Sequence, residues 1–265
     1  MVITSVFLCT TFTAFWGMNP YSVRMTPKGN CTECCPIEEK EDIGFYLYTR
    51  SNTMTPQRLW VDNATSLYES NLKMYHPTVI YVHGFTEQAN AKGATTVKNA
   101  YLMRGSYNVI VVDWSPLCAF PWYAHAVVNT HAVGLYLAKF VRFIVRHGVP
   151  IKSIHLIGFS LGAEIVGFTG KDTTFGKLPR ITVSCSHDRA WQYYAESILN
   201  EKGFPAVRCA NYETFLAGVC NQHSDPRTNR SEIQYMGFAA NPRLKGKFFL
   251  ATNSREPFAT NYRKL

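Results

Sequence analysis

Apolar and polar residues follow one another along this chain in blocks that predict strands and helices in turn. Residues 86–105 can form a crossover helix. Residues 122–147 have apolar residues at helical spacing and predict a long helix that ends at Gly148 and Pro150. Short runs rich in β-branched residues are typical of strands buried on both faces of a parallel sheet. They lie at 78–82, 107–114, 153–157 and 180–184. This alternation predicts an α/β fold with a doubly wound, mostly parallel sheet.

A Gly-x-Ser-x-Gly motif stands where the third predicted strand meets the next helix. Ser160 lies between Gly158 and Gly162. In this context the motif is typical of a nucleophile elbow, a turn so sharp that only glycine fits on either side of the serine. The turn lifts the hydroxyl above the sheet at a helix N-terminus, which favours developing negative charge. The alternative is an ordinary serine N-cap between two glycines.

A second motif, HGF at residues 83–85, ends an earlier strand at the same carboxyl edge of the sheet. Ligands bind at this edge in such folds. Acyl transfer needs two backbone N–H donors for the oxyanion, and we expect Leu161, next to the serine, and Phe85 to supply them. His83 by itself is interpreted as a structural histidine that holds the loop.

The composition indicates export. Residues 1–20 are apolar with small residues and predict a secretory signal peptide, a short anchor or buried strand being the alternative; residues 21–265 are predicted as a single domain. Eight cysteines suit an oxidising compartment, and the seven outside the signal are an odd number, so one lacks an intrachain partner. Zinc binding at CTECC lacks a second ligand pair, which favours disulfides.

The net charge of +9 comes from scattered Lys and Arg, which argues against a nucleic-acid partner and allows a weak attraction to anionic lipid. Outside the predicted signal there is no apolar stretch of 18 residues, so the mature chain is expected to be soluble, and the signal and cysteines predict that it is extracellular. Three Asn-x-Ser/Thr sequons suit this location, at Asn30, Asn63 and Asn229.

Several separate motifs together resemble those of the pancreatic lipase family, in its arthropod members. This family contains secreted animal lipases and sn-1 phospholipases with the α/β-hydrolase fold. The matching segments follow the family order over residues 35–258. They are YVHGFTE, VIVVDWS, IHLIGFSLGAEIVGFTGK, LPRIT, CSHDRAWQYYAESI, CANYETFLAGVC, MGF and PFA.

The resemblance implies a carboxylic ester hydrolase acting on lipid acyl esters, of the triacylglycerol lipase or sn-1 phospholipase type. It implies no metal and no organic cofactor, a lipid ester as substrate, transient contact with a membrane or lipid-droplet surface, and a monomer. Triglyceride, phospholipid and galactolipid all remain open as substrates. The roles implied are nucleophile for Ser160, general base for His187, oxyanion donors for Phe85 and Leu161, and a disulfide between Cys209 and Cys220.

One part of the family pattern is missing. In the family, LPRIT continues into a Gly-Leu-Asp-Pro-Ala segment that carries the triad acid, and the lid follows before the Cys-x-His. Here Thr182 runs directly into VSCSHDRA. We therefore expect an internally truncated fold that has lost acid and lid together, with Cys185 left without its family partner. A non-catalytic lipid-binding protein, or a splice product without function, is the alternative.

No aspartate offers an obvious replacement for the acid. Asp172 lies beyond the far end of the nucleophile's helix, about 15 Å from Ser160 at 1.5 Å per residue. Asp188 adjoins His187 and diverges from it on a helix. Asp113 ends a strand at the active-site edge and is the best substitute. The remaining aspartates are Asp42, Asp62 and Asp225. We expect Ser160 and His187 on the same side of the sheet without a tight hydrogen bond.

Overall fold

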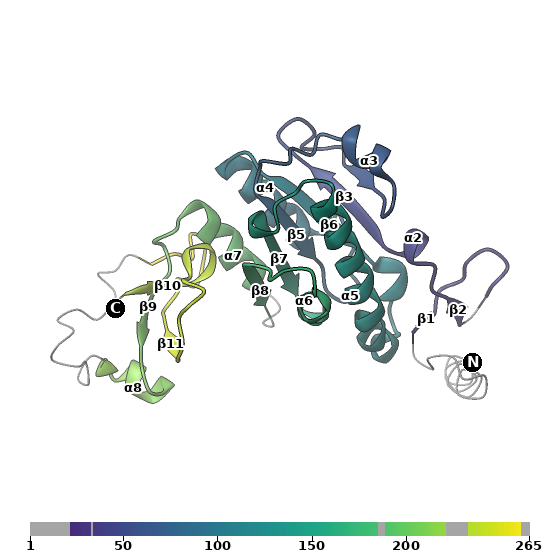
Figure 1. Cartoon of the computed structure of the whole chain (residues 1–265). Coiled ribbons are helices and arrows are strands. Elements are labelled where there is room, and N and C mark those ends of the chain that lie inside the picture. Colours follow the sequence, from purple (N-terminus) through teal and green to yellow (C-terminus); the bar gives the residue numbers. More distant parts are fainter. Residues whose placement is uncertain (1–21, 33, 185–188, 221–232, 261–265) are drawn as a thin grey trace. The chain divides into compact units, whose positions relative to one another are not determined.

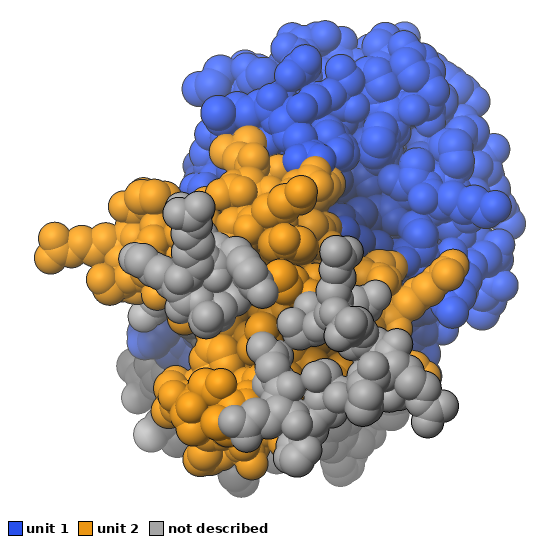
Figure 2. Space-filling view, turned by 90° about the vertical axis from the view of Figure 1, so that its left-hand side faces the viewer, with its two compact units in different colours: residues 1–187 blue, residues 188–265 orange. Residues whose placement is uncertain are grey.

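The computed structural model describes residues 22–32, 34–184, 189–220 and 233–260. The chain divides into two compact units, residues 1–187 and 188–265, which Figure 2 colours separately. The single domain predicted for residues 21–265 stays a prediction. The signal peptide predicted at 1–20 lies outside the described residues. In the described part of the chain, no helix is long and apolar enough to cross a membrane.

A six-stranded sheet forms the centre of the first unit (Figure 1). Its strand order is β4–β3–β6–β5–β7–β8, with β6, β5, β7 and β8 parallel and β3 antiparallel to both of its neighbours. These strands are β3 (Gly44–Tyr48), β4 (Gln57–Leu59), β5 (Thr78–Val82), β6 (Asn108–Asp113), β7 (Ile154–Phe159) and β8 (Arg180–Ser184). All four predicted strands are present, and the mostly parallel α/β sheet is confirmed. The antiparallel pair β3 and β4 extends it.

Helices cover both faces of this sheet. The crossovers are α4 (Lys92–Arg104), α5 (Tyr123–Arg146) and α6 (Leu161–Asp172), with the shorter α3 (Ala64–Tyr68) and η2 (Ile151–Ser153) in the connections. Successive residues of a strand point to opposite faces. In β7, His155 contacts Tyr101 of α4, whereas Leu156 belongs to the core that includes Val141 of α5.

Close packing joins α5 and α6, which lie together in Figure 1. A Cβ atom at Gly134 would lie 2.7 Å from Phe168 Cβ, so only glycine allows this approach. The Thr169 hydroxyl donates to the Gly134 carbonyl at 3.1 Å. Where α5 packs on the sheet, the rings of Phe140 and of Phe45 in β3 stack with centroids 3.8 Å apart. Each such buried side chain contributes roughly 1.5–3 kcal/mol.

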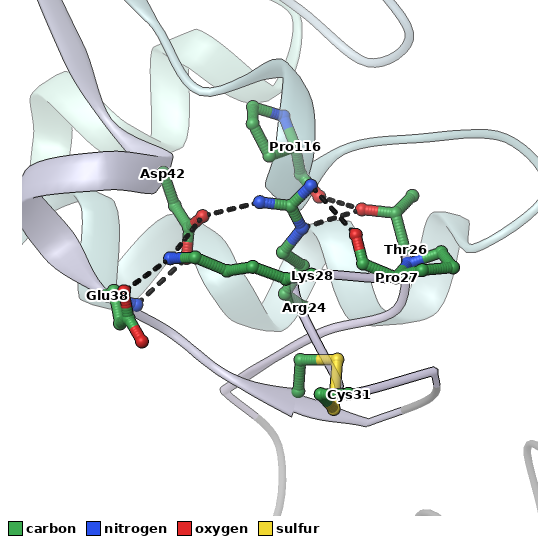
Figure 3. Close-up of a disulfide and its surroundings, with 9 residues drawn as sticks. Arg24, Thr26, Pro27, Lys28, Cys31, Glu38, Asp42 and Pro116 are labelled. Carbon is green, nitrogen blue, oxygen red and sulfur yellow. Dashed lines mark hydrogen bonds and ion pairs between the residues drawn. A yellow bond between two sulfur atoms is a disulfide. The ribbon is translucent and has the colours of Figure 1, made fainter.

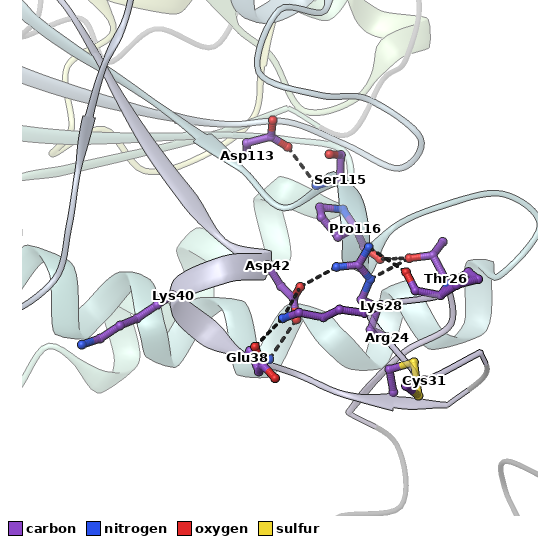
Figure 4. A network of polar contacts seen from close by, with 12 residues as sticks. Arg24, Thr26, Lys28, Cys31, Glu38, Lys40, Asp42, Asp113, Ser115 and Pro116 are labelled. Carbon is purple, nitrogen blue, oxygen red and sulfur yellow. Dashed lines mark hydrogen bonds and ion pairs between the residues drawn. A yellow bond between two sulfur atoms is a disulfide. The ribbon is translucent and has the colours of Figure 1, made fainter.

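The N-terminal arm, residues 22–32 and 34–36, is held by an ion-pair network around the buried Asp42 (Figure 3). Arg24 donates to the fully buried Asp42 at 2.7 Å, and Lys28 approaches the same oxygen at 3.2 Å. The Thr26 hydroxyl donates to the Pro116 carbonyl at 3.3 Å. Because Pro116 follows Ser115, a partner of Asp113, the arm supports the loop after β6 (Figure 4). The elements involved are β1 (Val23–Arg24), β2 (Cys35–Pro36), α2 (Glu39–Asp42) and η1 (Ser115–Leu117).

The second unit has a small three-stranded antiparallel sheet of order β10–β9–β11. The Glu196 carboxylate accepts from the backbone N–H groups of Phe258 and Ala259, both at 2.8 Å, and ties the chain end to α7. The elements are α7 (Ala190–Leu199), β9 (Pro205–Arg208), α8 (Tyr212–Leu216), β10 (Gln234–Tyr235), η4 (Gly237–Ala239) and β11 (Phe248–Phe249).

Candidate active site

Ser160 lies in a strained turn between β7 and α6. Its backbone has φ +53° and ψ −123°, in the left-handed half of the map that a residue with a side chain rarely occupies. A Cβ atom at Gly158 would overlap the Gly162 carbonyl and lie 2.7 Å from Ala163 Cα. A Cβ atom at Gly162 would overlap the carbonyl at the end of β5. Both glycines are thus required sterically, and the geometry is that of a nucleophile elbow.

The HGF loop packs directly against this elbow. A Cβ atom at Gly84 would lie 2.8 Å from Ser160 Cβ and 3.3 Å from the Phe159 carbonyl oxygen. The Gly84 N–H is held by the Glu87 carboxylate at 2.8 Å. Glycine at this position therefore lets the loop after β5 reach the serine.

His83 fixes the orientation of the peptide between Gly84 and Phe85. Its ring is fully buried, and Nδ1 lies 2.9 Å from the Gly84 carbonyl oxygen. A carbonyl only accepts, so Nδ1 carries the hydrogen. The Trp114 N–H lies 3.3 Å from Nε2 on the other side of the ring. His83 is thus a structural histidine in this geometry, as the sequence predicts.

The consequence of this bond is a free N–H on Phe85. A trans peptide is planar, so its carbonyl and its N–H point in opposite directions. Binding the Gly84 carbonyl to His83 therefore directs the Phe85 N–H away from His83. Among the described residues, neither this N–H nor that of Leu161 has an acceptor. Leu161 is the first residue of α6, where the helix dipole adds positive potential.

Asp113 is committed to the loops around it. Its carboxylate accepts from the Ser115 N–H at 2.9 Å and the Ala89 N–H at 3.3 Å, and lies 3.5 Å from His83 Nε2. Burial alone would raise the pKa of Asp113, but the nearby His83 ring and the hydrogen bond from Ser115 outweigh it and lower the pKa to about 2. The carboxylate is ionised and its oxygens are occupied by the scaffold.

Several predicted site residues lie outside the described part of the chain: Cys185, His187, Asp188 and Asp225. The predicted geometry between Ser160 and His187 therefore stays a prediction. Asp172 is the last residue of α6, at the end away from the elbow.

Two disulfides join described cysteines to each other. One joins Cys209 to Cys220 in the second unit, and the other joins Cys31 to Cys35 in the arm. Of the described cysteines, Cys118 is free; it is fully buried, and burial raises its pKa to about 12.

Sequence reasoning missed two neighbours of the oxyanion loop. Glu87 holds the loop through Gly84, and the ring of Tyr123 packs edge-on against Phe85 with centroids 5.0 Å apart. Glu87 could have been found from its place directly after the HGF motif. Nothing local signals Tyr123, because it comes from the start of α5.

The strand after the nucleophile's helix is exposed. Among the described strands, β8 pairs only with β7, and its Ile181 and Val183 are 39% and 55% exposed. Large β-branched side chains on a parallel strand are normally covered. This is the point where the sequence departs from the family pattern.

Comparison with known proteins identifies the family. The lipase family model matches residues 23–184 and 180–258, and the chain belongs to this family. The chain is 40% identical over 114 residues to phospholipase A1 VesT1.02 of Vespa tropica, covering 40% of this chain and 37% of that protein. It is 35% identical over 157 residues to phospholipase A1 2 of Dolichovespula maculata, covering 53% and 51%. The fold is that of the α/β hydrolases.

The matches also show how the chain departs from its relatives. It spans about half the length of these wasp proteins or less. Pancreatic lipase-related protein 2 of Bos taurus is 24% identical over 311 aligned positions, which use 84% of this 265-residue chain and 66% of the bovine protein. Several dozen of those positions thus have no residue of this chain opposite them. The family model likewise matches in two pieces that meet at residues 180–184.

Proposed function

We propose that this chain is a secreted lipase-type carboxylic ester hydrolase that acts on lipid acyl esters through Ser160, with its turnover limited by loss of the triad acid. The observation that carries the proposal is the strained elbow of Ser160, held between two glycines that tolerate no side chain. A serine that merely caps a helix does not need φ +53°.

In the proposed mechanism, His187 takes the Ser160 proton while the hydroxyl oxygen attacks the ester carbonyl carbon. The N–H groups of Phe85 and Leu161 stabilise the oxyanion. His187 then protonates the leaving alcohol. Water, deprotonated by His187, releases the fatty acid from the acyl-enzyme.

Loss of the acid is supported by three observations on the first unit. The family match is interrupted at β8, the apolar side chains of β8 are exposed, and Asp113 is bound to its own loops. Without a carboxylate, the imidazole of His187 is held in neither the required tautomer nor the required orientation. The similarity to proteins named phospholipase A1 supports glycerophospholipids as the substrate of this chain, with cleavage at the sn-1 ester.

The rival function is a non-catalytic lipid-binding protein on the same scaffold. It is favoured by the loss of the acid, because lipid binding needs no activated serine. Covalent labelling separates the two proposals, since a fluorophosphonate reacts with a serine only when the serine is activated.

The test compares fluorophosphonate labelling of the full chain with that of Ser160→Ala and of the chain denatured beforehand. We expect slow labelling of the folded chain at Ser160, found by peptide mass spectrometry and lost in both controls. Labelling no faster than in Ser160→Ala would favour the lipid-binding protein. A radiolabelled sn-1 phospholipid and a triglyceride, compared side by side, then assign the substrate class.

A further inference from the structure

One sequence motif has no place in the proposed active site: the sequon Asn63-Ala64-Thr65. It lies in the turn between β4 and α3, where Asn63 is the N-cap of α3. Both Asn63 and Thr65 are exposed. Sequons are accepted on surface turns of exported chains.

The two side-chain atoms of Asn63 have different surroundings. Oδ1 accepts the Ser66 N–H at 3.1 Å and caps the helix. Among the described residues, Nδ2 has no hydrogen-bond partner. N-glycosylation uses Nδ2 and leaves Oδ1 an acceptor, so a glycan here is compatible with the cap.

We propose that Asn63 carries an N-linked glycan, an inference that rests on the proposed export of the chain. In the transfer, the bond between C1 of the first sugar and the pyrophosphate of a lipid-linked oligosaccharide breaks, and a bond from C1 to Nδ2 forms. The lipid pyrophosphate leaves, and one amide proton goes to solvent.

Open space borders Asn63 on the folded surface. A pocket of about 420 Å³ is lined by Asp62 and Ala64 on either side of Asn63. Its other wall is the last two turns of α5 and the residue after it, including Arg142, Arg146 and His147. A sugar at Asn63 would therefore border the charged side chains at the end of α5, beside the apolar Val61 and Phe143 that also line the pocket.

The sequon at Asn30 offers a different environment. Its middle residue, Cys31, forms a disulfide with Cys35 and two backbone hydrogen bonds with Lys28, at 2.8 and 2.9 Å. Disulfide formation at the middle residue competes with transfer to the extended acceptor segment. Asn229, in the third sequon, lies outside the described residues.

The glycan would lie far from Ser160. The first residue of α5, Tyr123, contacts Phe85 of the oxyanion loop, and the pocket lies at the other end of this helix. With 24 residues, α5 is about 36 Å long at 1.5 Å per residue. The hydrophilic glycan would keep that end in water and leave the serine edge free to approach a lipid surface.

The test expresses the full chain in eukaryotic secretory cells, with its own N-terminus and, in parallel, behind an established secretory leader. Asn63→Gln and Thr65→Ala each remove the sequon, and Thr65→Ser keeps it. We expect both removals to abolish one step of the mobility shift that peptide N-glycosidase causes, while Thr65→Ser and Asn30→Gln retain that step. Peptide mass spectrometry should find the sugar on Asn63.

An unmodified Asn63 in chain recovered from the lumen or the medium behind the established leader would refute the glycan. Modification behind that leader only would preserve the Asn63 assignment and contradict the proposed export instead. Because Thr65→Ala leaves the Asn63 cap in place, its result does not depend on the stability of α3.

Discussion

Strands β7 and β8 are neighbours in one sheet, yet they differ in how many strands they pair with and in how well their side chains are covered. β7 pairs on both sides, with β5 and β8. It ends in the strained turn of Ser160, where Gly158 and Gly162 leave no room for a side chain. Within the described residues, β8 pairs with β7 alone and leaves Ile181 and Val183 exposed. The resemblance to the pancreatic lipase family implies that the triad acid follows this strand, after the helix of Ser160.

This difference separates the elements that position Ser160 from those that would activate it. The elbow, the Gly84 approach and the free N–H groups depend on β5, β7 and α6, which are intact. In the proposed mechanism, the orientation of His187 depends on the segment after β8, where the family match is interrupted. We therefore propose that this chain retains the donors for the oxyanion and lacks the carboxylate that would orient the imidazole.

The largest effect is expected on turnover. Loss of the triad acid typically lowers turnover about 10⁴-fold, so we expect hydrolysis of a short-chain ester at about that deficit from a full-length relative. Ser160→Ala should remove what remains. The measurement is steady-state release of a chromogenic alcohol. A rate within tenfold of the relative would mean that the departure from the family pattern after β8 does not limit turnover.

The next largest effect concerns the elbow of β7. Gly158→Ala forces Cβ onto the backbone of residue 162, and we expect a loss of about 3 kcal/mol in the free energy of unfolding. Gly167→Ala is the matched control in α6, because nothing lies within 4 Å of its Cβ. There we expect a gain of about 0.5–1 kcal/mol from helix propensity. Equal effects in urea denaturation would contradict the steric account.

The strands and the elbow could be predicted because their signals are local. β-branched runs mark β5 and β8 to the residue, and the spacing of Gly158, Ser160 and Gly162 marks the turn. The HGF motif likewise indicated that Phe85 lies beside the serine, which the approach of Gly84 to Ser160 agrees with.

Contacts between distant segments could not be predicted. The pair of Arg24 with Asp42 and the bond from Trp114 to His83 join residues 18 and 31 positions apart, and no periodicity signals them. The antiparallel strands β3 and β4 were also not predicted, since both depend on how segments pack.

A smaller effect is expected where β7 and β8 are joined by a side chain. His155 Nε2 lies 2.8 Å from the Thr182 hydroxyl, and Nδ1 lies 3.3 Å from the Tyr101 hydroxyl. Burial, with a smaller contribution from the Arg180 charge, lowers the pKa of His155 from 6.5 to about 3. Below pH 6.5 this histidine is therefore protonated in the unfolded chain, whereas in the folded chain it stays neutral until the pH approaches 3. The free energy of unfolding falls as the pH drops from 6.5 toward 3.

His155→Gln should flatten this fall, lowering the dependence of the unfolding free energy on pH by up to one proton. Thr182→Val keeps the histidine and removes its β8 partner, so it should retain the slope. Chemical denaturation at several pH values between 6.5 and 3 measures both. A slope unchanged in His155→Gln would place the acid sensitivity elsewhere in the chain.

The smallest effect is expected at the exposed strand itself. Val→Thr exchanges a methyl for a hydroxyl of nearly the same volume, so the same substitution compares two sites. Val111 in β6 is 1% exposed, and Val111→Thr should cost about 1–2 kcal/mol because the hydroxyl is desolvated. Val183→Thr should change stability by less than about 0.5 kcal/mol, since that side chain is 55% exposed and the hydroxyl keeps its water. Equal losses of unfolding free energy in urea denaturation of the two variants would mean that Val183 is covered in solution. The difference between β7 and β8 would then rest on the turnover measurement alone.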